Sequence, residues 1–206
     1  MSIIPSWLRT SAHLNASEGL EKPRLILGFI PLTDCAPLIV AKERGIFERY
    51  GLDVELSKET SWSNIRDKVS LGILDGAQML APMPISNSLN LGPVDKPMVT
   101  ALSLDLNGNA ITLSQALIER MGELDPEAMA ERPFTAKALK AVIADRQTQG
   151  GKPLTFAVVF PMSTHAYQLR YWLGAAGIDP DQDLNLVVVP PPQMVSQLRA
   201  GNIDGF

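Results

Sequence analysis

The chain has 206 residues, of which 46% are hydrophobic and 19% charged, a balance typical of a globular protein rather than a disordered one. Its formal net charge is −4 and it contains no basic run, which argues against a nucleic-acid-binding surface. Cys35 is the only cysteine, so an internal disulfide and a cysteine-based metal cluster are excluded. We find no phosphate-binding loop and no His-rich spacing, and we expect neither a cofactor nor a metal.

The first residues of the chain bear on its compartment. Residues 1–9 lack a basic start and Pro5 interrupts their apolar run, so no signal-peptide core is recognised. No stretch of the sequence approaches a membrane span. We therefore predict a cytoplasmic location, with the periplasm as the alternative if a start carrying a signal peptide is missing. Residues 1–22 are expected to form a flexible N-terminal arm.

From residue 24 onward, apolar runs alternate with helix-period segments. This alternation predicts an α/β fold with mainly parallel sheets. Residues 115–148 are expected to be largely helical, followed by a strand, a helix from about residue 164, a second strand and a last helix. Before them, strands are expected at 25–30, 52–56, 74–80 and 97–104.

We divide the chain into a first α/β lobe at 23–104 and a second at 105–206. A turn at 107–109 and a shift towards charged, helical sequence mark the boundary. Residues 202–206 look like the opening of another strand with nothing after it, which would leave a sheet edge unpaired. We therefore expect the second lobe to be incomplete and the chain to be truncated at its C-terminus.

Ligands of open α/β sheets bind beyond the carboxyl ends of the strands, in the loops that enter the next helices. Three such loops here are rich in hydroxyl or N–H donors, and each opens a helix, whose N-terminus favours a small anion. They carry Thr33 with Asp34, Ser61 with Trp62, and Thr164 with His165.

Each of these residues also has a purely structural interpretation. Ser and Thr before a helix are usually N-caps, and Trp62 is more often a packing residue than a ligand wall. A lone histidine in a first helical turn is structural about as often as functional. Cys35 lies in an apolar run and is expected to be a buried small hydrophobe rather than a nucleophile. The convergence of three loops favours a binding site over an enzyme.

Several motifs together resemble the nitrate-binding solute receptors of ABC transporters, a family with bicarbonate-binding relatives. The resemblance covers about residues 24–206 and implies a periplasmic-binding-protein fold of the second type, whose two lobes close on nitrate or nitrite. The motifs are GFIPLTDCAPL at 28–38, SWSNIRDK at 61–68, LNGNAI at 106–111, FPMSTHAYQLRYWL at 160–173 and VVVPPPQMV at 187–195.

The resemblance implies that Trp62, Asn109 and His165 line the anion. The family usually carries glutamine where Asn109 stands, so this contact is shorter here. If His165 is the cationic partner, a nearby anion raises its pKa and binding weakens at alkaline pH. The supporting cleft loops contribute Thr33, Asp34, Ser61 and Thr164.

Residues 74–83, LDGAQMLAPM, are most like a branch of this family that lacks a signal peptide. Our first hypothesis is therefore a non-enzymatic cytoplasmic nitrate/nitrite sensor that regulates nitrate assimilation through an RNA-binding antiterminator partner. The alternative is the substrate-binding component of a nitrate or bicarbonate ABC transporter, with a membrane permease complex as its partner. A remote alternative is an enzyme on the same fold, such as a thiamine-pyrimidine synthase.

Overall fold

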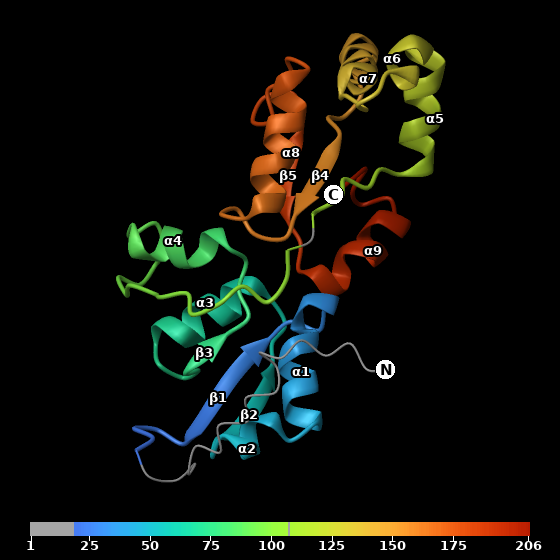
Figure 1. Ribbon diagram of the computed structural model, residues 1–206. Coiled ribbons are helices and arrows are strands. Elements are labelled where there is room, and N and C mark those ends of the chain that lie inside the picture. Colours follow the sequence, from blue (N-terminus) through green and yellow to red (C-terminus); the bar gives the residue numbers. More distant parts are fainter. Residues whose placement is uncertain (1–18, 107) are drawn as a thin grey trace, which may run out of the picture.

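The computed structural model describes residues 19–106 and 108–206 and arranges them in two lobes, each built around a parallel sheet (Figure 1). The first lobe has the strand order β2-β1-β3, and the second contains β4-β5. The predicted α/β fold with mainly parallel sheets is therefore confirmed. Most of the predicted N-terminal arm, residues 1–18, lies outside the described part of the chain. A domain boundary between residues 104 and 105 stays a prediction.

The first lobe forms because apolar strands alternate with helices. β1 (Arg24–Phe29) pairs in parallel with β2 (Asp53–Lys58) on one side and with β3 (Gly76–Ala77) on the other. Proline stands in the first turn of α1 and of α4, where a helix has no use for the missing backbone N–H. The helical elements are η2 (Thr33–Cys35), α1 (Ala36–Glu43), α2 (Ile46–Arg49), α3 (Trp62–Ser70) and α4 (Pro82–Ser88).

Two predicted strands of this lobe are corrected by the structure. β3 covers only Gly76–Ala77 of the predicted 74–80, and the described part of the chain forms no strand at 97–104. A strand needs a neighbouring strand to bond its backbone groups. In this segment the backbone of Met98 bonds to a side chain instead. The Met98 N–H donates to Ser88 Oγ at 3.2 Å, and the same hydroxyl donates to the Met98 carbonyl at 3.3 Å.

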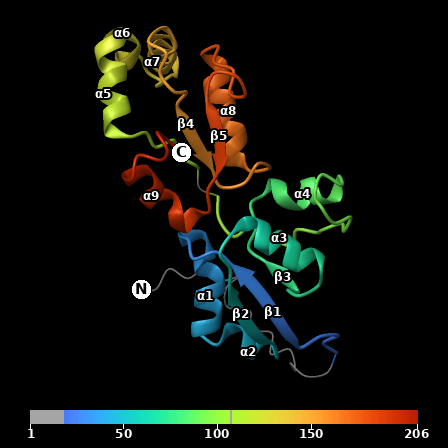
Figure 2. The same cartoon turned by 180° about the vertical axis from the view of Figure 1, so that it is seen from behind.

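The second lobe begins with the predicted helical region, which divides into α5 (Gln115–Leu124), α6 (Pro126–Ala130) and α7 (Lys137–Thr148). Figure 2 shows these three helices grouped at the end of the molecule that lies away from the first lobe. Phe156 of the sheet is fully buried in the core that they and α8 cover. The remaining elements are β4 (Thr155–Val158), α8 (Thr164–Ala175), β5 (Asn185–Val188) and α9 (Pro191–Arg199).

The last residues of the chain extend the second sheet. The Ala157 N–H donates to the Gly205 carbonyl at 2.9 Å, which places the C-terminal segment beside β4. On its other side, Thr112 and Phe206 exchange two backbone hydrogen bonds of 2.7 and 2.9 Å. The expectation of an unpaired edge at 202–206 is therefore wrong, because the partner segment comes from a distant part of the sequence.

An apolar cluster joins the two lobes. Ile30, Trp62 and Met83 of the first lobe pack with Phe160, which follows β4 in the second. The guanidinium carbon of Arg66 lies 5.5 Å from the centroid of the Phe160 ring, in a cation–π contact. The loop between β4 and α8 is therefore held against the first lobe, so that the start of α8 faces the loops that follow β1 and β2 (Figure 1).

Candidate functional site

A cleft of about 1760 Å³ lies between the lobes and takes its walls from both. The loops after β1 and β3, with Trp62 at the start of α3, line one side, and residues 108–113 with the beginnings of α8 and α9 line the other. Of the candidate residues named from the sequence, all except Ser61 line this cleft. They are Thr33, Asp34, Trp62, Asn109, Thr164 and His165.

Trp62 is the first residue of α3 and packs into the apolar cluster between the lobes, with only 1% of its surface exposed. Its packing role is therefore real. Its indole nitrogen Nε1, however, is buried and has no hydrogen-bond partner among residues 19–106 and 108–206. A buried unpaired donor is costly, which makes this N–H a candidate for a ligand.

His165 lies in the first turn of α8, as the sequence predicted. Ser163 caps this helix, because its Oγ accepts a hydrogen bond of 3.0 Å from the backbone N–H of Ala166. The imidazole Nδ1 is buried and unpaired within the described chain. Burial lowers the pKa of His165 from its ordinary value of 6.5, while the negative charge of Asp34 acts in the opposite direction. In the free protein, burial therefore shifts the protonation equilibrium of His165 towards the neutral imidazole.

Asn109 ties the segment between the lobes to α8. Its Nδ2 donates to Thr164 Oγ1 at 3.2 Å and to Gln168 Oε1 at 2.8 Å, so both amide hydrogens have partners inside the protein. In this conformation Asn109 positions the Thr164 hydroxyl rather than offering a free donor. Its predicted direct contact with an anion stays a prediction.

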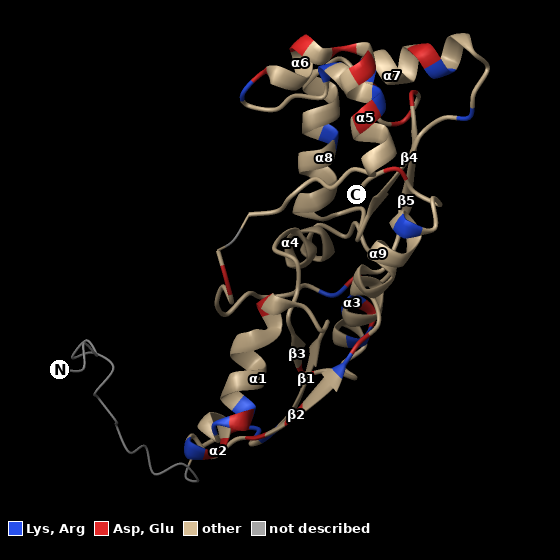
Figure 3. Cartoon of the chain, turned by 90° about the vertical axis from the view of Figure 1, so that its right-hand side faces the viewer, with Lys and Arg blue, Asp and Glu red and all other residues tan. Residues whose placement is uncertain are grey.

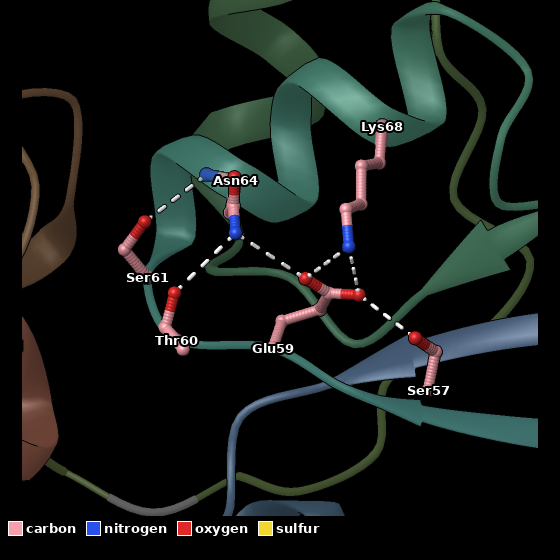
Figure 4. Close-up of polar contacts among 6 residues, drawn as sticks. All are labelled: Ser57, Glu59, Thr60, Ser61, Asn64 and Lys68. Carbon is pink, nitrogen blue, oxygen red and sulfur yellow. Dashed lines mark hydrogen bonds and ion pairs between the residues drawn. The ribbon is translucent and has the colours of Figure 1, made fainter.

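Ser61 serves the site indirectly, as a helix cap. Its Oγ accepts a hydrogen bond of 3.2 Å from the backbone N–H of Asn64 (Figure 4). The Asn64 side chain in turn donates to Thr60 Oγ1 at 3.3 Å and to Glu59 Oε2 at 3.4 Å. These bonds fix the loop between β2 and α3 that carries Trp62.

Glu59 is the centre of this network and was missed by the sequence analysis. It is 2% exposed, and Lys68 Nζ donates to both of its carboxylate oxygens at 2.8 Å. Ser57 Oγ donates to the same carboxylate at 2.9 Å (Figure 4). The sequence shows only a glutamate after a predicted strand and a lysine nine positions later, which does not by itself predict this buried pair.

A second residue missed by the sequence analysis is Gln78, which is 2% exposed and lines the cleft. Its Oε1 accepts a hydrogen bond of 2.9 Å from the Ile30 N–H, and its Nε2 is buried without a partner in the part of the chain that the structure describes. A glutamine within the otherwise apolar run at 77–81 was the available signal.

The charged residues that line the cleft do not attract anions as a group. Acidic side chains outnumber basic ones there: they are Asp34, Asp75 and Asp105, against Lys96. Asp75 is paired with Lys22, whose hydrogen bond is the main cause of its lowered pKa. Elsewhere Lys and Arg are interspersed with Asp and Glu (Figure 3). An anion in this cleft would therefore depend on local N–H donors.

Three further observations concern metals, membranes and Cys35. Within residues 19–106 and 108–206, no group of three or more His, Cys, Asp or Glu side chains is placed to hold a metal ion. The same residues include no helix long and apolar enough to cross a membrane. Cys35 is buried and free, which confirms its expected environment.

Comparison with known proteins places the chain in a family. A family model described as the NMT1-like family matches residues 18–206. The chain belongs to the NMT1-like family. Its structure resembles the crystal structure of the periplasmic nitrate-binding protein NrtA from Synechocystis, with a TM-score of 0.76 and 35% sequence identity over 90% of this chain and 46% of that one. The predicted two-lobed periplasmic-binding-protein fold is thereby confirmed.

Curated relatives of this NMT1-like chain include proteins named for nitrate and for bicarbonate. The nitrate import ATP-binding protein NrtC of Synechocystis is 48% identical over 197 residues, which make up 95% of this chain and 27% of that protein. The bicarbonate transport ATP-binding protein CmpC of the same organism is 44% identical over 195 residues, covering 93% and 27%. The chain spans about a quarter of the length of these two relatives. It also matches the nitrate/nitrite binding protein NrtA of Nostoc at 41% identity and the bicarbonate-binding protein CmpA of Synechococcus elongatus at 36% identity, which confirms the predicted resemblance to nitrate- and bicarbonate-binding proteins.

Proposed function

We propose that this chain contributes a binding site for a small planar oxyanion, nitrate or nitrite, and works by ligand-dependent closure of its two lobes. The proposal rests on two nitrogen atoms considered together, Trp62 Nε1 and His165 Nδ1. The two residues come from opposite lobes and line one cleft, and both atoms are buried and unpaired among the described residues. The names of the relatives agree with such a ligand.

The chemistry of the two side chains suits an oxyanion. The indole N–H can only donate, and a neutral imidazole carries one N–H that can also donate. Each buried donor without a partner costs about 1–3 kcal/mol, which an anion oxygen between the lobes would offset. A bound anion also favours the imidazolium, so binding would raise the pKa of His165 from its lowered value in the free protein.

Calorimetry on the full chain tests this proposal, with nitrate, nitrite, bicarbonate and methanesulfonate as ligands. We expect nitrate and nitrite to bind, and Trp62→Phe and His165→Gln each to weaken binding by about tenfold, the effect of one hydrogen bond to a charged group. Trp172→Phe is the matched control, because its indole N–H already donates to the Phe134 carbonyl at 3.2 Å. Tighter binding of bicarbonate, or an unchanged affinity in both site variants, would contradict the assignment.

For the cellular role we infer a part in nitrate import, because similar proteins such as NrtC and CmpC carry transport names. The substrate-binding component of a nitrate transporter is then partnered by a membrane permease complex. The second candidate is the cytoplasmic nitrate/nitrite sensor with an antiterminator partner, which rests on the sequence of residues 74–83. Cell fractionation followed by affinity capture separates the two, since permease subunits support transport and an antiterminator supports sensing.

A further inference from the structure

Gln78 sits where two strands of the first lobe end. Its backbone N–H donates to the Gly28 carbonyl at 3.0 Å, so the chain continues beside β1 for one residue beyond β3. Its side chain then crosses the end of β1, where Oε1 accepts a hydrogen bond of 2.9 Å from the Ile30 N–H. The carboxyl end of this parallel sheet forms part of the cleft wall.

The hydrogen bond to Ile30 fixes which way the Gln78 amide points. A backbone N–H is a donor only, so it must meet the oxygen of the amide and not the nitrogen. The Nε2 group therefore points away from β1, and within the described chain it is buried and has no partner. Leaving it unpaired costs about 1–3 kcal/mol, which a ligand atom that accepted this hydrogen bond would offset.

Asn87, another deeply buried side-chain amide, differs from Gln78: its nitrogen is paired, and its Oδ1 is the buried atom that has no partner among the described residues. The Asn87 Nδ2 group donates to the Lys96 carbonyl and to Ser70 Oγ, and Asn87 does not line the cleft. Gln78 lines the same cleft as Trp62 and His165, and like them it keeps a buried nitrogen unpaired among residues 19–106 and 108–206.

We propose that Gln78 is a third ligand contact, whose Nε2–H donates to an oxygen of the bound oxyanion. This inference rests on the proposed function and deepens it. Nε2 is covered in the present conformation, so the side chains around it must shift when the ligand enters. Because Gln78 and Trp62 can offer only donors to the ligand, they favour an anion without a proton, such as nitrate, over bicarbonate, whose O–H needs an acceptor.

Two substitutions at Gln78 test the contact. Gln78→Glu keeps an acceptor for the Ile30 N–H but replaces the donor by a carboxylate oxygen, and Gln78→Met removes both polar atoms. We expect each to raise the Kd for nitrate by about tenfold or more, as measured by calorimetry on the full chain. Gln147→Glu is the control, because it makes the same change of charge at an exposed position of α7 outside this cleft.

The outcomes separate this inference from the function on which it rests. If the wild-type chain binds nitrate and both Gln78 variants bind it equally well, Gln78 is not a ligand contact while the proposed function stands. If the wild-type chain binds neither nitrate nor nitrite, both proposals fail. Should the variants not fold, as judged by circular dichroism, the side-chain amide resonances of Gln78 in the isotope-labelled wild-type protein decide: a shift on addition of nitrate supports the contact, and no shift overturns it.

Discussion

The carboxylate of Asp34 and the imidazole of His165 line the same cleft from opposite lobes, and the charge of Asp34 opposes the effect of burial on His165. Burial is the stronger influence, so the pKa of His165 lies below its ordinary value of 6.5. Asp34 therefore helps to keep His165 able to take up a proton when an anion arrives, although its own charge repels that anion.

Replacing Asp34 by Asn should lower the pKa of His165 further, because the opposing negative charge is removed. Titration of the His165 ring resonances in the wild type and in Asp34→Asn measures the change. Saturating nitrate should raise the pKa in both proteins. A His165 pKa that is identical in the two proteins would mean that the carboxylate does not act on the imidazole.

The stability of the free protein should depend on the protonation of His165. Since its folded-state pKa lies below the unfolded-state value, the unfolded state binds more protons between the two values. The contribution of His165 is therefore fully present above about pH 6.5 and is lost as the pH falls through the folded-state pKa. Urea unfolding from about pH 7.5 to about pH 5 should show a steeper loss of stability in the wild type than in His165→Gln. Parallel curves would contradict this.

The buried pair of Glu59 and Lys68 should matter for stability through the loop that carries Trp62. Lys68→Met leaves the Glu59 carboxylate buried without its cation, which should lower the free energy of unfolding by about 3 kcal/mol. Adding Glu59→Gln should recover part of that loss. The exposed pair of Lys137 with Glu131 supplies the control, because Lys137→Met should change the unfolding midpoint little. Equal effects of the two lysine substitutions would argue against a special role for Glu59.

Gly205 should be intolerant of a side chain, because it lies between β4 and residues 112–114. A Cβ there would stand 2.7 Å from Phe156 Cε1, 2.8 Å from Leu113 Cδ2 and 3.0 Å from the Thr112 carbonyl oxygen. Gly205→Ala should therefore destabilise the second lobe by about 1–3 kcal/mol. Gly174→Ala on α8 is the matched control. A Cβ added at Gly174 has no atom within 4 Å, so this change should stabilise the helix by about 0.5–1 kcal/mol. Thermal unfolding of both variants tests the contrast, and a neutral Gly205→Ala would contradict the close packing.

Much of the fold was predictable, because local sequence patterns indicate strands such as β1 and β4 and the start of α8 after Ser163. The predicted strand at 97–104 failed because a strand depends on a neighbour, which local sequence does not reveal. The expectation of an unpaired edge at residues 202–206 failed for the same reason, because these residues pair with residues 112–114.

All predicted site residues except Ser61 line one cleft, since loops at the carboxyl ends of parallel strands converge. The roles of Glu59 and Gln78 were not predicted. Both are polar residues that look exposed in sequence, and their burial and partners arise only from tertiary contacts.

The central claim is that a planar oxyanion between the lobes accepts a hydrogen bond from the indole N–H of Trp62. The most direct test follows the indole N–H resonances of isotope-labelled full-length protein during a nitrate titration, with Trp62→Phe and Trp172→Phe to assign them. The account predicts that the Trp62 signal shifts with saturation while the Trp172 signal, whose N–H is held by Phe134, moves little. A Trp62 signal that stays in place while nitrate binds would contradict the account.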